Sequence, residues 1–554
     1  MVWTSKTWNN ERIFDADMNR MEDGLYGRAF SKIVCVDGQS GDETTIANAL
    51  SALGAAGGGA VMVKANQDDG NPPRIDIAST LTIPDKTWLI SDGVILRRTT
   101  GSLMAQFAAS AEDCGVAGFR LDGNSLAPEC IAIGSTNKNI KILNNKFYDI
   151  ERAYISLDAP EDVTIRDNKF LGFGTSNQNH AVYIGNPAKN VHIINNSIQN
   201  MYAHGIRVNG NASNVNIIRN YLYNCATLGG NYPISVKYGN VVRVNRNTID
   251  GGVSAGIWIE HNPTKYWVKG NYIANCASGI NATANLGLVK NNIMESITNG
   301  ITIAGEQVSC KENYILSPTA IGIYITASVI TSKDVVAEDN VITDAGTYGF
   351  DIDAGTGKCK IEGNKIESGS SCIRVNGGTM HHFIEDNKFE MPSPAVGSAF
   401  LDVTGNYILD GSKINGNWMD GNGNDMYGIT LANITNGYID ISVNHIRSIE
   451  RAGLYASNCT GRGWAIQRNQ LRRCAGYGGV GNRPMILDDV AYSVILGNVI
   501  NTAGIVPTHG IYESGTANFN NFAANHIFGY STAAIRVLGG SSQAVANVTG
   551  AAAF

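Results

Sequence analysis

The sequence carries one short pattern sixteen times, with its asparagine running from position 145 to position 525. Each copy has an apolar residue, two variable positions, an asparagine, one variable position and a second apolar residue, as in Ile142, Asn145 and Phe147. The copies recur at intervals of 20 to 30 residues, and such a period is the signature of a solenoid whose units stack on their neighbours. The asparagines assigned to the pattern are Asn145, Asn168, Asn196, Asn220, Asn247, Asn271, Asn291, Asn313, Asn340, Asn364, Asn387, Asn417, Asn444, Asn469, Asn498 and Asn525.

A second signal accompanies each asparagine. An apolar, variable, apolar triplet precedes it by 11 to 17 residues, for example at residues 206–208 and 257–259. This alternation is typical of a strand, so the two signals together predict two strands per repeat. Amphipathic helical spacing is missing from residue 120 onward, which argues against repeats that contain a helix. We therefore predict an all-β, single-stranded parallel β-helix of about 16–17 coils, with asparagines in stacked turns about 4.8 Å apart.

The composition agrees with this prediction and excludes other classes of protein. The 554 residues include 63 Gly and only 13 Pro, as expected for tight turns in a long solenoid. The net charge of −6 and the dispersed basic residues argue against a nucleic-acid partner. The ten cysteines form no CxxC pair, and Cys225, Cys276 and Cys474 are expected to be buried thiols. No signal peptide and no run of 18 apolar residues is visible, so we expect no membrane insertion.

The N-terminal region differs from the repeats. From Lys32 onward the chain reads as a strand, the acidic turn VDGQSGDETT, the helical segment TTIANALSALGAA, a GGG run and the strand AVMVKA. This order resembles the N-terminal cap of the pectate-lyase-like β-helices of bacteriophage tailspikes, and the resemblance covers residues 32–547. The opening TWNNERIFDADMNRMEDGL is similar to segments that join a phage spike or fibre to the virion. We therefore expect a virion-attachment segment at 1–30, a small α/β cap with the first coils at 31–125, and a glycan-binding β-helix at 126–554.

The resemblance implies a right-handed helix and a function. Tailspikes are homotrimers on the virion tail that act outside the host cell, where they bind and usually cleave a bacterial surface polysaccharide such as O-antigen or capsule. The chain would attach to a phage tail or baseplate protein through its N-terminus. The resemblance identifies no active site, because tailspikes share no short catalytic motif.

The residues themselves indicate a candidate site. In an apolar, variable, apolar strand the middle side chain points outward, so stacked coils form outward columns. Over residues 153–261 these columns bring together aromatic and polar side chains along a strip roughly 20 Å long, which is room for several sugar rings. The strip contains His180, Tyr183, His204, Arg207, Asn209, Tyr232, Lys237, Trp258 and Glu260.

Each of these residues also has a structural interpretation. The aromatic side chains could be buried in a subunit interface, which favours such residues. Glu260 and Lys237 could form a surface ion pair of little consequence. His204 could be a capping residue, and Asn209 could belong to a turn.

Two chemistries are open for the strip. Glu260 could act as general acid or base while Lys237, Arg207 and His204 stabilise a substrate carboxylate or transfer a proton. On a glycan that contains uronic acid, β-elimination would use His204, Lys237 or a tyrosine as base after Arg207 neutralises the carboxylate. Hydrolysis needs two carboxyl groups about 5–9.5 Å apart, and Asp158 lies four coils from Glu260, roughly 19 Å away. Purely adhesive binding and a free-standing polysaccharide lyase remain alternatives.

A second candidate lies further along the chain. Asp351 and Asp353 point outward from one strand with Cα atoms about 7 Å apart, a separation compatible with hydrolysis. Tyr324 and Arg374 beside them are candidates for substrate contacts. Arg374 also lies between Asp351 and Asp402, so the acids could simply balance its charge. Asp351 and Asp353 could hold calcium, but the acids and histidines form no close ligand cluster, so we expect no metal and no cofactor.

Overall fold

The computed structural model describes residues 32–36, 41–65, 73–172, 179–260, 263–326, 334–353, 357–379, 381–408, 411–435, 437–459, 463–475, 483–502, 507–537 and 541–550. The chain forms two compact units, Met1–Ile198 and Gln199–Phe554. The expected virion-attachment segment at 1–30 lies outside the described residues.

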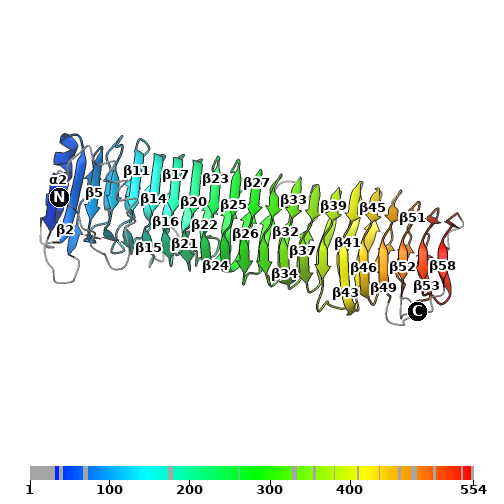
Figure 1. Ribbon diagram of the computed structural model, residues 1–554. Coiled ribbons are helices and arrows are strands. Elements are labelled where there is room, and N and C mark those ends of the chain that lie inside the picture. The colour runs from blue at the N-terminus through cyan, green and yellow to red at the C-terminus, as the bar shows by residue number, and fades with distance from the viewer. Residues whose placement is uncertain are drawn as a thin grey trace, which may run out of the picture. The chain divides into compact units, whose positions relative to one another are not determined.

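Short strands stack along the chain (Figure 1). In each unit their parallel pairings form three ladders. In unit 1 the first ladder contains β1 (Lys32–Val36), β2 (Gly59–Ala65), β5 (Thr87–Ser91), β8 (Gly115–Ala117), β11 (Lys138–Leu143), β14 (Glu161–Arg166) and β17 (Lys189–Ile194). The second contains β3 (Arg74–Ile77), β6 (Ile95–Arg98), β9 (Arg120–Asp122), β12 (Lys146–Tyr148) and β15 (Lys169–Leu171). The third contains β4 (Leu81–Ile83), β7 (Ala105–Phe107), β10 (Glu129–Ile133), β13 (Ala153–Leu157) and β16 (His180–Ile184).

Unit 2 repeats this arrangement over more coils. Its first ladder contains β20 (Ser213–Ile218), β23 (Val242–Asn245), β25 (Tyr266–Lys269), β27 (Gly287–Lys290), β30 (Ser309–Lys311), β33 (Val335–Glu338), β36 (Cys359–Glu362), β39 (His382–Glu385), β42 (Ser412–Asn415), β45 (Ile439–Ser442), β48 (Ala465–Gln467), β51 (Val494–Leu496), β54 (Asn521–Ala523) and β57 (Gln543–Val545). Its second contains β21 (Tyr221–Tyr223), β28 (Ile293–Glu295), β31 (Tyr314–Leu316), β34 (Val341–Ala345), β37 (Lys365–Ser368), β40 (Lys388–Glu390), β43 (Trp418–Asn424), β46 (His445–Ile449), β49 (Gln470–Cys474), β52 (Val499–Asn501), β55 (His526–Phe528) and β58 (Val548–Gly550).

The third ladder of unit 2 carries most of the candidate site residues. It contains β19 (Ile206–Val208), β22 (Ile234–Val236), β29 (Asn299–Ile303), β32 (Ile321–Ile325), β35 (Tyr348–Ile352), β38 (Ser371–Thr379), β41 (Ala399–Ile408), β44 (Tyr427–Ile434), β47 (Leu454–Ser457), β50 (Met485–Asp488), β53 (His509–Ser514) and β56 (Ala533–Arg536). Two long strands, β24 (Thr248–Ile259) and β26 (Tyr272–Ala282), run through both the second and third ladders.

The predicted parallel β-helix is confirmed, but the prediction of two strands per coil is wrong. Each coil has three strands, and the asparagine pattern crosses the bend between two of them. Ile142 lies in β11 on the first ladder, whereas Phe147 lies in β12 on the second. A three-residue strand such as β12 has only one inward side chain. The two apolar residues of the pattern therefore belong to two different strands, although together they look like the signal of one.

Buried asparagines connect the coils at this bend. In unit 2 the side-chain Nδ2 of each asparagine donates to Oδ1 of the next along the ladder, from Asn220 to Asn547, at 2.9–3.0 Å. The side chain of Asn340 uses its full capacity: it accepts from N and Nδ2 of Asn313 and donates to Asn364 and to the carbonyl of Cys310. The asparagines are therefore structural, as predicted.

One member of the predicted series is off by one residue. The ladder contains Asn292, which is fully buried, and the neighbouring Asn291 is exposed in the turn with φ of 54°. Both residues are asparagines and both fit a turn. Only the spacing to the inward residues Val289 and Met294 shows that Asn292 is the ladder residue. The ladder also extends one coil further than predicted, to Asn547.

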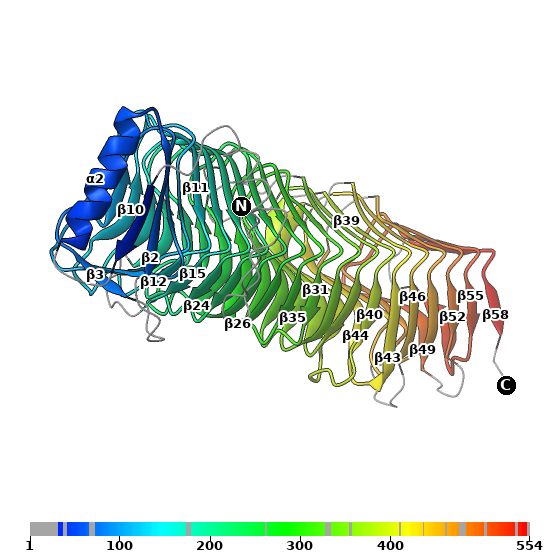
Figure 2. The ribbon, with the colours of Figure 1, turned by 60° about the vertical axis from the view of Figure 1, so that its left-hand side comes forward.

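Helix α2 (Asp42–Ala55) confirms the expected cap of unit 1. Its apolar face, including Ile46, Leu50 and Leu53, is buried, and Figure 2 shows the helix lying across the first strands of the unit. Glu43 accepts hydrogen bonds from the backbone of Ala78 and Ser79, at 3.0 and 2.6 Å. The helix thereby covers a sheet edge that would otherwise be open to pairing with other chains.

The beginning of several third-ladder strands requires glycine. A Cβ on Gly300 would lie 2.3 Å from the carbonyl oxygen of Gly322 in the next coil, and a Cβ on Gly322 would lie 2.6 Å from that of Gly349. This close approach explains why glycine precedes so many of the apolar triplets. The nine cysteines whose surroundings are described are buried and free, including the predicted Cys225, Cys276 and Cys474. Among the described helices, none has the length and apolar character needed to cross a membrane.

Candidate functional site

The strand register places the predicted central column on the third ladder of unit 2. Each residue of this column pairs with the next: Arg207, Ser235, Trp258, Asn281, Thr302, Tyr324, Asp351, Arg374, Asp402, Thr430 and Tyr455. In unit 1, Ser156 pairs with Tyr183 in the same way. Inward isoleucines and valines flank the column and are buried, because successive side chains of a strand point to opposite faces of the sheet.

Two aromatic rings form a platform on this ladder. The rings of Tyr232 and Trp258 lie with centroids 4.3 Å apart at an angle of 36°, and both side chains are partly exposed. Tyr232 precedes β22, and Trp258 is the outward residue of β24 in the next coil. We refer to these two residues as the aromatic platform. Burial, with a smaller effect of the Glu260 carboxylate, raises the pKa of Tyr232.

His204 lies behind the platform and is buried, although the outward column predicted an exposed side chain. Only 3% of its surface is accessible. Its Nδ1 accepts a hydrogen bond from the backbone N–H of Tyr232 at 3.0 Å, and the two rings lie 6.0 Å apart and nearly parallel. The strand-based prediction failed because His204 lies at the corner between two ladders. At this corner, a side chain that the strand pattern places outside points into the core. His204 therefore positions Tyr232.

Polar side chains surround the platform with atoms that have no protein partner. Among the described residues, no hydrogen-bond partner exists for the buried atoms Arg207 Nε, Glu260 Oε2 and Asn281 Oδ1. A buried polar atom left unsatisfied costs about 1–3 kcal/mol, so a ligand toward which these side chains turned would remove that cost. Asn281 follows Trp258 in the column, and sequence reasoning placed it there without selecting it as a site residue.

The remaining contacts at the strip are weak. Lys237 Nζ lies 3.9 Å from Glu260 Oε1, and the ammonium group is 5.6 Å from the centre of the Tyr238 ring. Arg207 Nη2 lies 3.5 Å from Asn209 Oδ1. The predicted ion pair between Lys237 and Glu260 therefore exists but leaves one oxygen of the carboxylate unused.

Glu260 has no neighbouring acid on the described part of this ladder. Asp250 and Glu295 belong to the second ladder, where they accept hydrogen bonds from Asn275 and Tyr272. A pair of carboxylates for hydrolysis is thus missing around the platform in the described residues.

Unit 1 contains the other two residues of the predicted strip. The rings of His180 and Tyr183 stack at 5.4 Å with an angle of 17°. His180 is buried, unlike the prediction, and occupies the same corner position in its coil as His204 does in unit 2. Asp158, also in unit 1, accepts a hydrogen bond from Asn186.

The alternative pair Asp351 and Asp353 has a structural role in this arrangement. Arg374 donates two hydrogen bonds to Asp351, at 2.8 and 2.6 Å, and its guanidinium carbon lies 4.0 Å from the Tyr348 ring centre. Asp351 is 3% accessible, so it is not the exposed acid that the column predicted. Asp353 accepts a hydrogen bond from Tyr324 at 2.9 Å. This geometry favours the interpretation that Asp351 balances the charge of Arg374.

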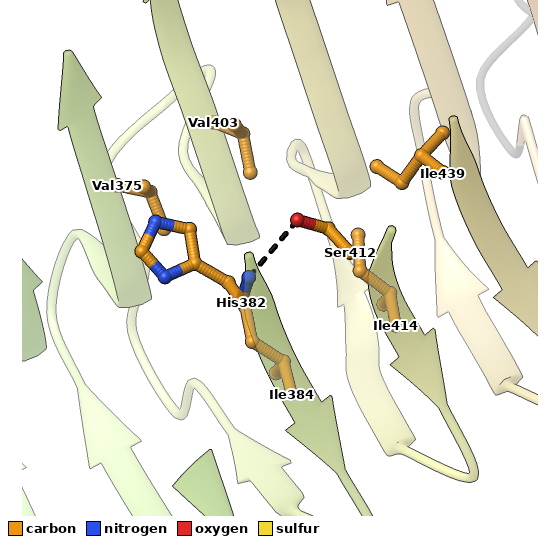
Figure 3. Close-up of a pocket in the computed structure, with 7 residues that line it drawn as sticks. All are labelled: Val375, His382, Ile384, Val403, Ser412, Ile414 and Ile439. Atoms are coloured by element: carbon orange, nitrogen blue, oxygen red, sulfur yellow. Dashed lines mark hydrogen bonds between the residues drawn. The ribbon is translucent and has the colours of Figure 1, made fainter. Parts of the chain in front are cut away.

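A cavity in unit 2 is too small and too apolar to be a substrate site. His382 and Ser412 line it with Val375, Ile384, Val403, Ile414 and Ile439 (Figure 3). Its volume of about 10 Å³ is at the lower limit for one water molecule. The Ser412 hydroxyl accepts a hydrogen bond from the backbone N–H of His382, at 2.9 Å. The imidazole makes no hydrogen bond to the serine, so the two residues do not form a catalytic dyad.

Within the described ranges, no three His, Cys, Asp or Glu side chains are grouped to hold a metal ion. The burial that surrounds the thiols also opposes nucleophilic chemistry, since it raises the pKa of Cys225 and of Cys276 to about 12.

Comparisons with known proteins concern the fold. A family model described as a right handed beta helix region matches residues 129–266 and 262–366. Among curated proteins, nothing matches the chain.

Three solved structures illustrate the likeness. The surface adhesin PfbA of Streptococcus pneumoniae shares 13% identity over 66% of this chain and 88% of its own, with a TM-score of 0.37. The A-module of the mannuronan C-5 epimerase AlgE4 of Azotobacter vinelandii shares 16% over 68% and 100%, with a TM-score of 0.36. The Dettilon tailspike protein shares 12% over 72% and 72%, also with a TM-score of 0.36. At these identities and TM-scores the likenesses carry no information on substrate or mechanism. The family match and the three parallel ladders together identify the fold as a right-handed parallel β-helix.

Proposed function

We propose that this protein binds an extended polysaccharide along the third ladder of unit 2, centred on the aromatic platform. The observation that carries the proposal is the coincidence of two partly exposed rings, Tyr232 and Trp258, with unpartnered polar atoms of Arg207, Glu260 and Asn281. Aromatic side chains offer a flat apolar surface with a polar edge, which matches the apolar face of a sugar ring. A few placed polar groups then fix orientation.

A pair of tryptophan variants tests this proposal. We expect Trp258→Ala to weaken binding to a bacterial surface polysaccharide at least tenfold, because the platform loses its larger ring. Trp267→Ala is the matched control, since Trp267 is also partly exposed but lies on the first ladder, where Arg243 and Lys265 cover it. The polysaccharide is first selected from an array of surface glycans, and affinities are then measured by calorimetry. Equal losses in both variants would refute the assignment of the binding face.

Cleavage by β-elimination is a second candidate, and the solitary Glu260 carboxylate favours it over two-carboxylate hydrolysis. Arg207 would neutralise the carboxylate of a uronic acid, and Glu260 would take the proton from C5. The C4–O bond then breaks, a C4–C5 double bond forms, and the departing oxygen takes up a proton. Glu260→Gln should bind the glycan but produce no shortened, ultraviolet-absorbing fragments. Shortening without such absorbance would point to hydrolysis instead.

The setting we propose is a phage tailspike that recognises a bacterial surface polysaccharide from the virion tail, outside the host cell. A homotrimer would suit the outward apolar column on the second ladder of unit 2. Tyr221, Ile293 and Tyr314 are 40%, 41% and 50% exposed there, and such residues are typical of subunit interfaces. The segment 1–30 would attach the spike to a tail or baseplate protein.

A further inference from the structure

Two arginines near the end of the third ladder of unit 2 share one tyrosine ring. The guanidinium carbon of Arg483 lies 3.2 Å from the centre of the Tyr512 ring, and that of Arg536 lies 4.7 Å from it. Arg536 also donates to the Tyr512 hydroxyl at 2.9 Å. The register explains the cluster, because Tyr512 pairs with Arg536 in the next coil and with Ile486, three residues after Arg483, in the preceding one. We call Arg483, His509, Tyr512 and Arg536 the arginine cluster.

Other arginines stacked on rings in unit 2 have an acceptor for their charge or hydrogen bonds. Arg374 over Tyr348 binds Asp351, and Arg451 over Tyr427 binds Asp425. Arg447 over Trp418 binds Asp420. On the first ladder, Arg243 over Trp267 donates to the side chain of Asn214 at 2.7 Å. Three of these four arginines on aromatic rings thus form an ion pair with an acid.

The arginine cluster lacks such an acid among the described residues, since none lies within 4.0 Å of a nitrogen of either arginine. Arg483 Nε is buried without a hydrogen-bond partner. The nearby Glu513 points into the core, where Asn520 and Ser542 donate to it at 2.7 and 2.8 Å, and Asp488 accepts from Ser514. The adjoining segments 476–482, 503–506 and 538–540 contain no Asp or Glu in their sequence. Two positive charges thus lie against one tyrosine ring, and no described acid forms an ion pair with either of them.

The positive charge of the two arginines affects the pKa of His509. Its ring lies 5.4 Å from that of Tyr512, and burial together with the charges of Arg483 and Arg536 lowers its pKa. An anion bound at the arginines would oppose the second of these effects.

We infer that the arginine cluster is a binding site for a carboxylate group of an acidic polysaccharide, separate from the aromatic platform. Guanidinium groups match the planar, two-oxygen geometry of a carboxylate, and Tyr512 holds both in place with its ring. Ten register steps separate Trp258 from Tyr512, roughly 48 Å at the spacing of parallel strands. A long acidic chain along this face would meet both sites.

Calorimetry with a galacturonic acid hexamer tests the inference, with a glucose hexamer as the neutral control and inorganic phosphate as a second anion. The acidic hexamer should bind, and Arg483→Gln and Arg536→Gln should each weaken binding at least tenfold. Arg472→Gln, on the exposed face of the second ladder, should leave binding unchanged. In the same titration followed by NMR, the pKa of His509 should rise. Trp258→Ala should not alter this response, which separates the site from the platform.

Three results would overturn the inference. The first is equal binding of acidic and neutral hexamers, and the second is unchanged binding in both cluster variants when circular dichroism shows them folded. The third is phosphate binding at these arginines as tightly as the hexamer, which would make the site one for free phosphate and not for a sugar carboxylate.

Discussion

At the scale of single residues, His382 makes stability depend on pH. Burial lowers its pKa to about 4, below the ordinary value of 6.5, so the folded protein keeps this imidazole neutral while the unfolded chain protonates it below pH 6.5. Stability should therefore fall as the pH drops from about 6.5 towards 4, by up to about 3 kcal/mol from this group. Thermal melting at pH 7.5 and pH 4.5 measures the effect. His382→Leu should reduce the difference between the two midpoints, whereas His526→Gln, at an exposed position, should preserve it.

The ion pair of Arg374 with Asp351 gives a second prediction at this scale. Asp351→Asn should lower the free energy of unfolding by about 1–3 kcal/mol, because it removes a buried carboxylate from a half-buried guanidinium. Asp420→Asn breaks the more exposed pair with Arg447, where the arginine side chain is 45% accessible, and should cost less than about 1 kcal/mol. Denaturant unfolding compares the two. A folded, equally stable Asp351→Asn variant that had lost cleavage of a glycan would favour a catalytic aspartate instead.

Sequence reasoning was accurate for residues in the middle of strands and inaccurate at corners. The outward positions of Trp258, Asp351 and Arg374 follow from strand alternation. The burial of His204 does not, since it depends on a hydrogen bond to Tyr232 in the next coil. The burial of Asp351 under Arg374 likewise depends on a neighbour 23 positions along the chain. Contacts between coils are invisible in a local pattern.

At the scale of elements, the asparagine ladder should contribute directly to stability. Asn340→Ala removes the hydrogen bonds of the Asn340 side chain to both neighbouring coils. It leaves the buried backbone N–H of Asn313 without its acceptor, at about 1–3 kcal/mol for each unsatisfied group. Because solenoids lose stability locally, the measurement is hydrogen exchange, which should accelerate most in the coils that contain residues 313–364. Asn376→Ala, at an exposed position, should leave exchange unchanged. Uniform acceleration along unit 2, or none, would contradict a local role.

The number of ladders per coil could not be predicted for a related reason. Strands of three residues carry one inward side chain, and the bends between them take asparagine or aspartate with positive φ as readily as a surface turn does. The period of the repeat therefore predicted the class of fold, and the helical segment before the repeats predicted the cap that α2 forms. The third ladder appears only when coils are stacked in register.

At the scale of the whole molecule, the apolar column on the second ladder predicts self-association. Light scattering should give three times the chain mass of 59.1 kDa. Tyr314→Glu should produce monomers by placing a charge in the interface, whereas Tyr438→Glu, also on the surface with 42% exposure, should not. A monomeric native protein at micromolar concentration would refute the trimer.

The most direct test of the account is a crystal structure of the protein with an oligosaccharide from the polysaccharide that it binds. We predict sugar rings lying along the third ladder of unit 2, with one ring stacked on Trp258 and its hydroxyl or carboxylate groups bonded to Arg207, Glu260 and Asn281. Sugar bound only on the first or second ladder, with the platform unoccupied, would contradict the central claim.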